Sequence, residues 1–170
     1  ELGHRVPGML AFKLLRPDWS IRLKSETLSA SIKTDLLHHV RLNEGVIHGH
    51  GRFVYRMAQA GVKRLLVQAP RSGLALTFHG EGIAQVLESD PDQGIWQIEL
   101  DEKADHTYTL EAKDQEPYTT EQGRVRLQPL KALDVDSQKG YLVVETGDRL
   151  QVKAVDVEPG LNVDDARTIP

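Results

Sequence analysis

Three histidines are the residues of this chain best suited to hold a metal ion. His48 and His50 are separated by a single glycine, so on a β-strand their side chains point to the same face. His38 precedes them and approaches them if the chain reverses between the two segments. Imidazole nitrogen is a preferred ligand of zinc and nickel. The sequence therefore predicts a candidate metal site formed by His38, His48 and His50.

The turn at Asn43-Glu44-Gly45 decides which of these histidines meet. A three-residue loop brings His38 opposite His50, and a register shifted by one residue brings His39 there instead. Cross-strand partners have Cβ atoms about 4.5–5.5 Å apart, which is within reach of one bound ion. The alternative is that these histidines are polar residues on a solvated sheet face, beside glycines that let another backbone approach.

A second pattern imitates part of a calcium-binding loop. Asp134, Asp136 and Gln138 alternate as the first oxygen ligands of such a loop do, and Glu145 stands at its twelfth position. The sixth position requires glycine, but it is occupied by Lys139. An ordinary hairpin turn is therefore the structure we expect at this site.

The familiar catalytic motifs are missing. The chain contains no cysteine, which excludes disulfides, thiolate catalysis and cysteine-based zinc sites. It also has no nucleophile elbow, phosphate-binding loop, HExxH sequence or dinucleotide-binding glycine motif. We expect no enzymatic activity, no catalytic residue and no cofactor.

Apolar and polar residues alternate with a period of two through most of the chain. The alternation occurs in segments 19–23, 28–32, 47–57, 74–78, 96–100, 108–112, 125–127, 141–143 and 150–154. Such alternation is typical of half-buried strands, and turn-forming residues separate the segments. No window predicts a long amphipathic helix. The sequence predicts an all-β fold, an antiparallel β-sandwich of about ten or eleven short strands with minimal helix.

Trp19 and Trp96 each stand on the apolar side of an alternating segment. We therefore expect both rings in the core, where tryptophan often anchors a sandwich. Exposed rings would instead favour a carbohydrate-binding module, because sugars stack on exposed aromatic side chains.

The polar stretch at residues 113–123 is a candidate domain boundary. We expect a main β-sandwich over residues 1–115. Residues 116–170 then supply C-terminal strands that complete the sandwich or form a small appended β unit, and a single domain is an equal alternative.

Composition narrows the class of protein further. The chain has 170 residues, of which 39% are hydrophobic and 27% charged, as is usual for a folded domain. The net charge of −4 argues against nucleic-acid binding, and no apolar run is long enough for membrane insertion. The chain opens Glu1-Leu2-Gly3-His4, without methionine or a signal peptide, so we expect a piece of a longer protein.

Two stretches carry a resemblance to known proteins. Residues 43–70 read NEGVIHGHGRFVYRMAQAGVKRLLVQAP, and residues 139–170 read KGYLVVETGDRLQVKAVDVEPGLNVDDARTIP. They resemble β-sandwich segments of large, uncharacterised bacterial exported or envelope proteins, although Asn43-Glu44-Gly45 stands where those proteins usually have an Asp-Gly pair. The first stretch is also similar to the non-catalytic N-terminal β-sandwich of zinc aminopeptidases of the HExxH class. The resemblance implies an accessory, extracytoplasmic module and assigns no catalytic residue.

The function we expect is that of a non-catalytic structural or protein-interaction module of a larger bacterial exported protein. Its partners would be neighbouring domains of the same chain or another protein. A carbohydrate-binding module is the first alternative, and a metal-binding domain built on the histidine hairpin is the second.

Overall fold

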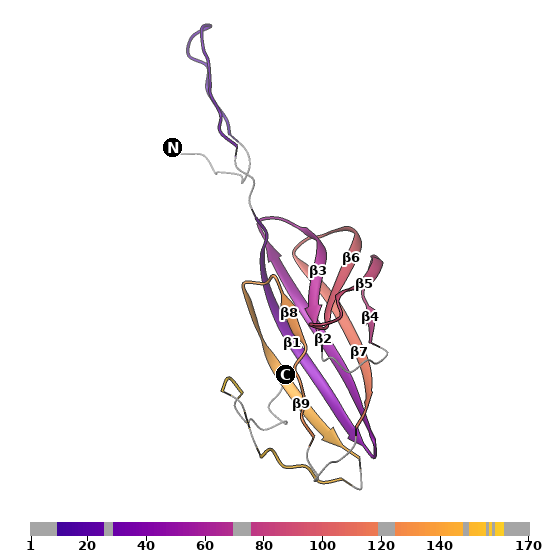
Figure 1. Ribbon diagram of the computed structural model, residues 1–170. Helices are drawn as coiled ribbons and strands as arrows, with labels where there is room; N and C mark the ends of the chain where they lie inside the picture. The colour runs from indigo at the N-terminus through magenta and orange to yellow at the C-terminus, as the bar shows by residue number, and fades with distance from the viewer. Residues whose placement is uncertain are drawn as a thin grey trace.

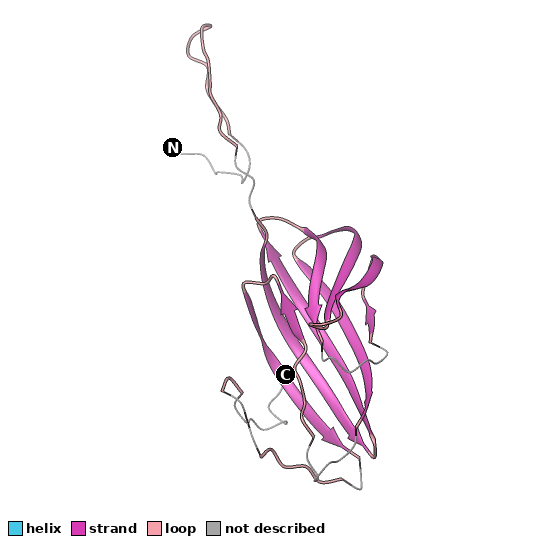
Figure 2. Cartoon of the chain, in the orientation of Figure 1, coloured by secondary structure: helices cyan, strands magenta, loops and turns pink. Residues whose placement is uncertain are grey.

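The computed structural model describes residues 10–25, 29–69, 76–118, 125–147, 150–155, 157 and 159–161. Within these residues the chain forms nine β-strands and no helix (Figure 1, Figure 2). The strands are β1 (Ser31–Asn43), β2 (Val46–Ala58), β3 (Val62–Gln68), β4 (Thr77–His79), β5 (Ile83–Asp90), β6 (Ile95–Ala104), β7 (Thr107–Pro117), β8 (Lys131–Leu133) and β9 (Ser137–Thr146). The predicted all-β class is confirmed, with nine strands in the described residues instead of ten or eleven.

Three alternating segments do not pair with a neighbour, and three observed strands, β3, β5 and β8, lie outside the alternating segments. Segments 19–23, 125–127 and 150–154 alternate in sequence, yet their described residues belong to no strand. Alternation assigns side chains to opposite faces of an extended chain, but a strand also needs an adjacent backbone to complete its hydrogen bonds. Periodicity alone therefore predicted three strands that the described residues do not form and missed three that they do.

The nine strands form two sheets that pack face to face (Figure 1). The first sheet has the order β4-β7-β2-β1-β9, and the second has the order β5-β6-β3-β8. Neighbouring strands are antiparallel, as predicted, apart from β1 and β9, which run parallel. The exception arises because β9 follows β8 of the other sheet and enters the first sheet beside the start of β1.

The inner faces of the two sheets form the main core. Alternate residues of β1 and β2 point inward, among them Ile32, Leu36, Phe53 and Tyr55, and all four are buried. The second sheet contributes buried residues from β3, β6 and β8 to the same core. The inward residues of those three strands are Leu65, Val67, Ile98, Leu100 and Ala132. Burial of this apolar set is the main source of stability in such a domain.

The long strands of the first sheet extend beyond the second sheet. β1 and β2 have 13 residues each, whereas β3 has 7 and β8 has 3. Near the β1–β2 turn a separate small core therefore forms from Val40, Leu42 and Ile47. The partly buried side chains packed against it are Tyr118, Val125, Leu127 and Leu150. Non-strand segments thus close the end that the second sheet does not reach.

The C-terminal strands belong to these same two sheets. β8 pairs with β3, and β9 pairs along ten residues with β1. The expected division between residues 115 and 116 falls inside β7, which continues to Pro117. Residues 113–117, expected in a linker, therefore form part of a sheet strand, while residues 119–124 lie outside the described part of the chain.

β9 passes very close to β1 at one glycine. Gly140 has a φ of 156°, and a Cβ atom added there would lie 1.7 Å from the carbonyl oxygen of Leu36. That oxygen belongs to the backbone of the paired strand, so it cannot move aside as the end of a side chain can. The parallel pair therefore requires glycine at this position.

We expect Gly140→Ala to lower the free energy of unfolding by about 3 kcal/mol, because β9 must shift away from β1 to admit the methyl group. Urea denaturation measures the change. Lys139→Ala, on the exposed neighbouring residue, is the control and should change stability by less than about 0.5 kcal/mol. A Gly140→Ala protein as stable as the wild type would contradict the close parallel pairing.

Candidate functional site

The β1–β2 turn fixes the positions of the histidines. Asn43 pairs with Val46, so the loop has two residues, and Gly45 has the positive φ of 77° that a tight hairpin turn requires. In this register His39 lies opposite His50, and His38 lies opposite Gly51. The three-residue loop that we expected first is therefore wrong, and the register shifted by one residue is the one observed.

The register also separates the three predicted metal ligands. His38 points to the inner face and is 4% exposed, whereas His48 and His50 lie on the outer face of the same sheet. The sheet backbone stands between them, so the structure does not bring His38, His48 and His50 together. Among the described residues no group of three or more histidine, aspartate or glutamate side chains is placed to hold a metal ion.

The outer face carries a different histidine pair, flanked by two carboxylates. His39 Nε2 lies 3.0 Å from Glu145 Oε2 on β9, and His50 Nε2 lies 3.4 Å from Glu111 Oε2 on β7. The second contact lacks hydrogen-bond geometry, although the His50 nitrogen itself is shielded from solvent. All four side chains are between 38% and 48% exposed, so each pair stabilises the fold by at most about 1 kcal/mol.

His38 is a neutral core residue. Burial, together with the nearby His39 and His50, lowers its pKa from 6.5 to about 4. Its neighbours along the inner face of β1 are Leu36 and Val40, both buried. An imidazole in this position serves packing, and it is uncharged at neutral pH.

Two inward carboxylates were missed by sequence reasoning. Asp114 and Glu116 continue the inner face of β7 past the main core, and burial raises the pKa of both. Asp114 lies over Gly49, where an added Cβ would stand 2.0 Å from its Oδ1 atom. The signal was available, since the alternation that begins at Tyr108 leads to Asp114 on the same face.

The calcium-like residues have structural partners. Asp136 Oδ2 accepts hydrogen bonds from Ser31 Oγ at 2.6 Å and from the Ile32 backbone N–H at 2.9 Å. Gln138 Oε1 accepts a bond of 2.6 Å from the backbone N–H of Ala132. These hydrogen bonds fix the connection between β8 and β9. The expected hairpin turn is wrong, because this turn joins the two sheets and does not connect neighbouring strands of one sheet.

Residues 10–25 form an arm that extends from the sandwich (Figure 1). Every residue of the arm is exposed, including Trp19 at 62%. The expectation that Trp19 lies in the core is therefore wrong, because no described strand pairs with the arm. Trp96 does pack against the main core, and its ring centroid lies 5.8 Å from that of Phe78.

No protein-family model matches the chain, and no curated protein sequence matches it. The described residues include no helix with the length and apolar composition needed to span a membrane. Function must therefore be inferred from the geometry of the described residues.

The burial of His38 predicts a loss of stability in mild acid. Above pH 6.5 the imidazole is neutral in the folded and unfolded chains. As the pH falls from 6.5 to about 4, the unfolded chain binds a proton that the folded chain does not, so unfolding becomes more favourable. The accumulated loss is about 3 kcal/mol and is complete below pH 4.

We expect the free energy of unfolding of the wild type to fall by about 2 kcal/mol more than that of His38→Leu between pH 7 and pH 5. Urea denaturation at both pH values measures it, and His79→Leu, a replacement of an exposed histidine on β4, should retain the wild-type dependence. The raised pKa values of Asp114 and Glu116 act in the opposite direction, but equally in all three proteins. Equal pH slopes for wild type and His38→Leu would refute the buried neutral histidine.

Proposed function

We propose that the chain is a non-catalytic structural or protein-interaction module of a larger bacterial exported protein, acting outside the cytoplasm. Its contacts are with neighbouring domains of the same chain or with another protein. The observation that carries the proposal is the arm, which holds a concentration of uncovered apolar side chains. Those exposed by 46% or more are Leu10, Phe12, Leu14, Leu15, Trp19, Ile21 and Leu23.

An exposed apolar surface formed by these seven large side chains is typical of an interaction site. Single exposed apolar residues are normal on a protein, but a contiguous group is favoured only when something covers it. The sandwich does not need the arm for its own core, because both hydrophobic clusters are built from residues 30–150. The arm is therefore available for contact with a partner.

The polar residues of the sandwich support a scaffold role. Asp136 and Gln138 bind backbone atoms of β1 and β8, and His38 is packed in the core. Asp114 and Glu116 are the described carboxyl groups whose pKa is raised, and partial burial at the end of the sheet is the main cause of each shift. A structural role accounts for the position of each of these groups, which supports a non-catalytic module.

Photo-crosslinking tests the interaction role. Benzoylphenylalanine replaces Ile21, on the apolar side of the arm, in cells that make the protein, and Ser20 is the matched neighbouring control. We expect crosslinks to protein from position 21 and few from position 20, identified by mass spectrometry. Equal labelling from both positions, or none from position 21, would contradict the proposal.

Carbohydrate binding is the second candidate, and the exposed rings favour it. Trp19 is 62% exposed and Tyr141 is 42% exposed, and such rings could stack on sugars. The two lie on different elements, the arm and β9, whereas a polysaccharide site needs rings aligned on one surface.

A glycan array distinguishes the two candidates. We expect no saturable binding by the wild type, because the exposed rings of Trp19 and Tyr141 lie on separate elements. Glycan binding that is lost in both Trp19→Ala and Tyr141→Ala would favour the carbohydrate module over the interaction module.

A further inference from the structure

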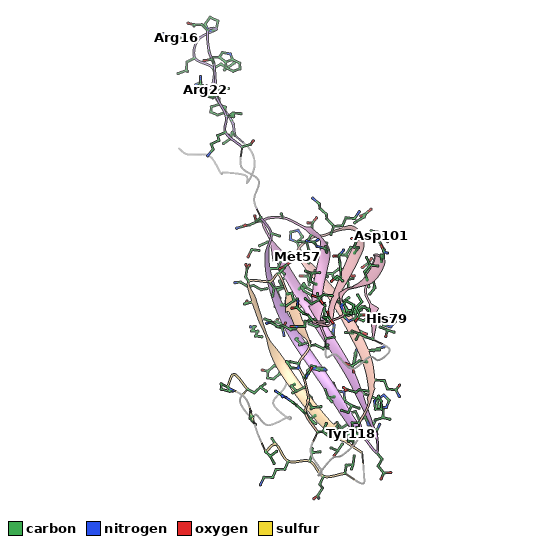
Figure 3. All side chains as sticks on the ribbon, viewed as in Figure 1. Arg16, Arg22, Met57, His79, Asp101 and Tyr118 are labelled. Carbon is green, nitrogen blue, oxygen red and sulfur yellow. The ribbon has the colours of Figure 1, made fainter. Side chains whose placement is uncertain are left out.

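The arm has the sequence of an amphipathic β-hairpin. The chain bends at Arg16-Pro17 and returns alongside itself, with Arg16 at the far end and Arg22 on the returning leg (Figure 3). A four-residue loop over residues 15–18 would place Leu14 opposite Trp19. The same register sets Phe12 opposite Ile21 and Leu10 opposite Leu23.

This register sorts the arm into two faces. All six of those apolar side chains share one face, because residues two apart on a strand point the same way. The other face carries Ala11, Lys13, Ser20 and Arg22. The arm thus has the two-sided pattern of a sheet strand pair, but in the structure its apolar residues are 46–71% exposed.

The apolar face is large enough for a specific contact. Six large side chains at this exposure present on the order of 700 Å². Each partner of a standard protein interface contributes about 800 Å², and the largest apolar patch of an ordinary monomer is about 300–600 Å². The apolar face is therefore large enough to bind the surface of a folded partner protein.

The sandwich offers an open strand edge. β9 is the last strand of the first sheet, and on its outer side it has no strand partner among the described residues. Residues 141–144 form an uncharged apolar run along this edge. The exposed fractions are 42% for Tyr141, 37% for Leu142 and 40% for Val144. An edge of this kind is a template for an added strand.

The arm matches the edge in spacing, and the arm and the rest of the chain carry net charges of opposite sign. Ile21 and Leu23 have the same two-residue spacing as Leu142 and Val144, so an added strand would extend the inner face. Residues 10–25 contain four of the 21 Lys and Arg residues and one of the 25 Asp and Glu residues. The arm therefore carries a charge of +3, and the rest of the chain carries −7.

Within one chain the two features stand apart. The arm leads away from the start of β1, and its far end is remote from β9 (Figure 1). A two-fold symmetric pair that sets one arm on the edge of the other copy also forms the reciprocal contact, because the same surfaces meet on both subunits. We propose that the arm folds as a β-hairpin that adds to the open edge of β9 in a second copy of the chain. This exchange rests on the proposed interaction role of the arm.

Analytical ultracentrifugation of the full chain at about 1–100 µM tests the exchange. We expect the wild type to sediment as a dimer, with twice the mass of one chain. Ile21→Glu should give monomers, whereas Ser20→Glu, with the same charge change on the opposite face of the arm, should remain dimeric. On β9, Leu142→Glu should give monomers and the exposed control Lys139→Glu should not. Circular dichroism confirms that each variant is folded.

Mixing the two monomeric variants identifies the contact. An intact arm from Leu142→Glu can still meet an intact edge from Ile21→Glu, so the mixture should form a heterodimer with one contact. A wild type that is monomeric throughout, a mixture that stays monomeric, or a dimer that survives Leu142→Glu would overturn the exchange. If the wild type is monomeric while position 21 crosslinks to another protein, the exchange fails and the interaction role stands.

Discussion

The rest of the structure depends on the register between β1 and β2. With Asn43 opposite Val46, the apolar residues of both strands reach the same face of the sheet. A shift of one residue would set Arg52 opposite Leu36 and place a charge in the core, because cross-strand partners share a face. The cost of burying that charge far exceeds any preference of the turn itself. The hydrophobic pattern therefore selects the two-residue loop, and Gly45 makes that loop accessible. The position of each histidine follows from this choice.

The unequal lengths of the two sheets explain the polar features inside the sandwich. Strands of 13 residues cannot be covered along their whole length by a second sheet whose strands are shorter. At the uncovered end the chain packs a second small core and leaves Asp114 beside Gly49, where no side chain competes for the space. Partial burial raises the pKa of Asp114, while the N–H of Gly49 opposes the rise. The same geometry buries His38 nearer the middle of the sheet, where water is excluded and the neutral imidazole is favoured.

Local features of the sequence predicted the local features of the fold. Alternation identified β2, β6, β7 and part of β9, and the turn residues Asn43-Glu44-Gly45 located the β1–β2 reversal. Alternation and turn residues could not predict which strand pairs with β9, or that no described strand of the sandwich pairs with the arm. The parallel pairing of β9 depends on where β8 leaves the other sheet, which is a long-range property. For the candidate site, the proximity of His50 to a histidine of β1 was predictable, but the choice between His38 and His39 required the register. Testing both registers against the apolar pattern would have resolved it.

The arm shows where periodicity reaches its limit. Trp19, Ile21 and Leu23 alternate as a core strand does, and nothing in their own sequence distinguishes them from the inward residues of β2. The residues of β2 have neighbouring strands and an opposing apolar face, whereas no described strand of the sandwich pairs with the arm. A sequence that specifies a strand where the described fold provides no sheet is locally inconsistent, and such inconsistencies in natural proteins concentrate at functional sites. The inconsistency is removed if the missing sheet belongs to another folded surface. An open edge such as that of β9, with its uncharged run at residues 141–144, meets this requirement, because β9 has no strand partner on its outer side among the described residues.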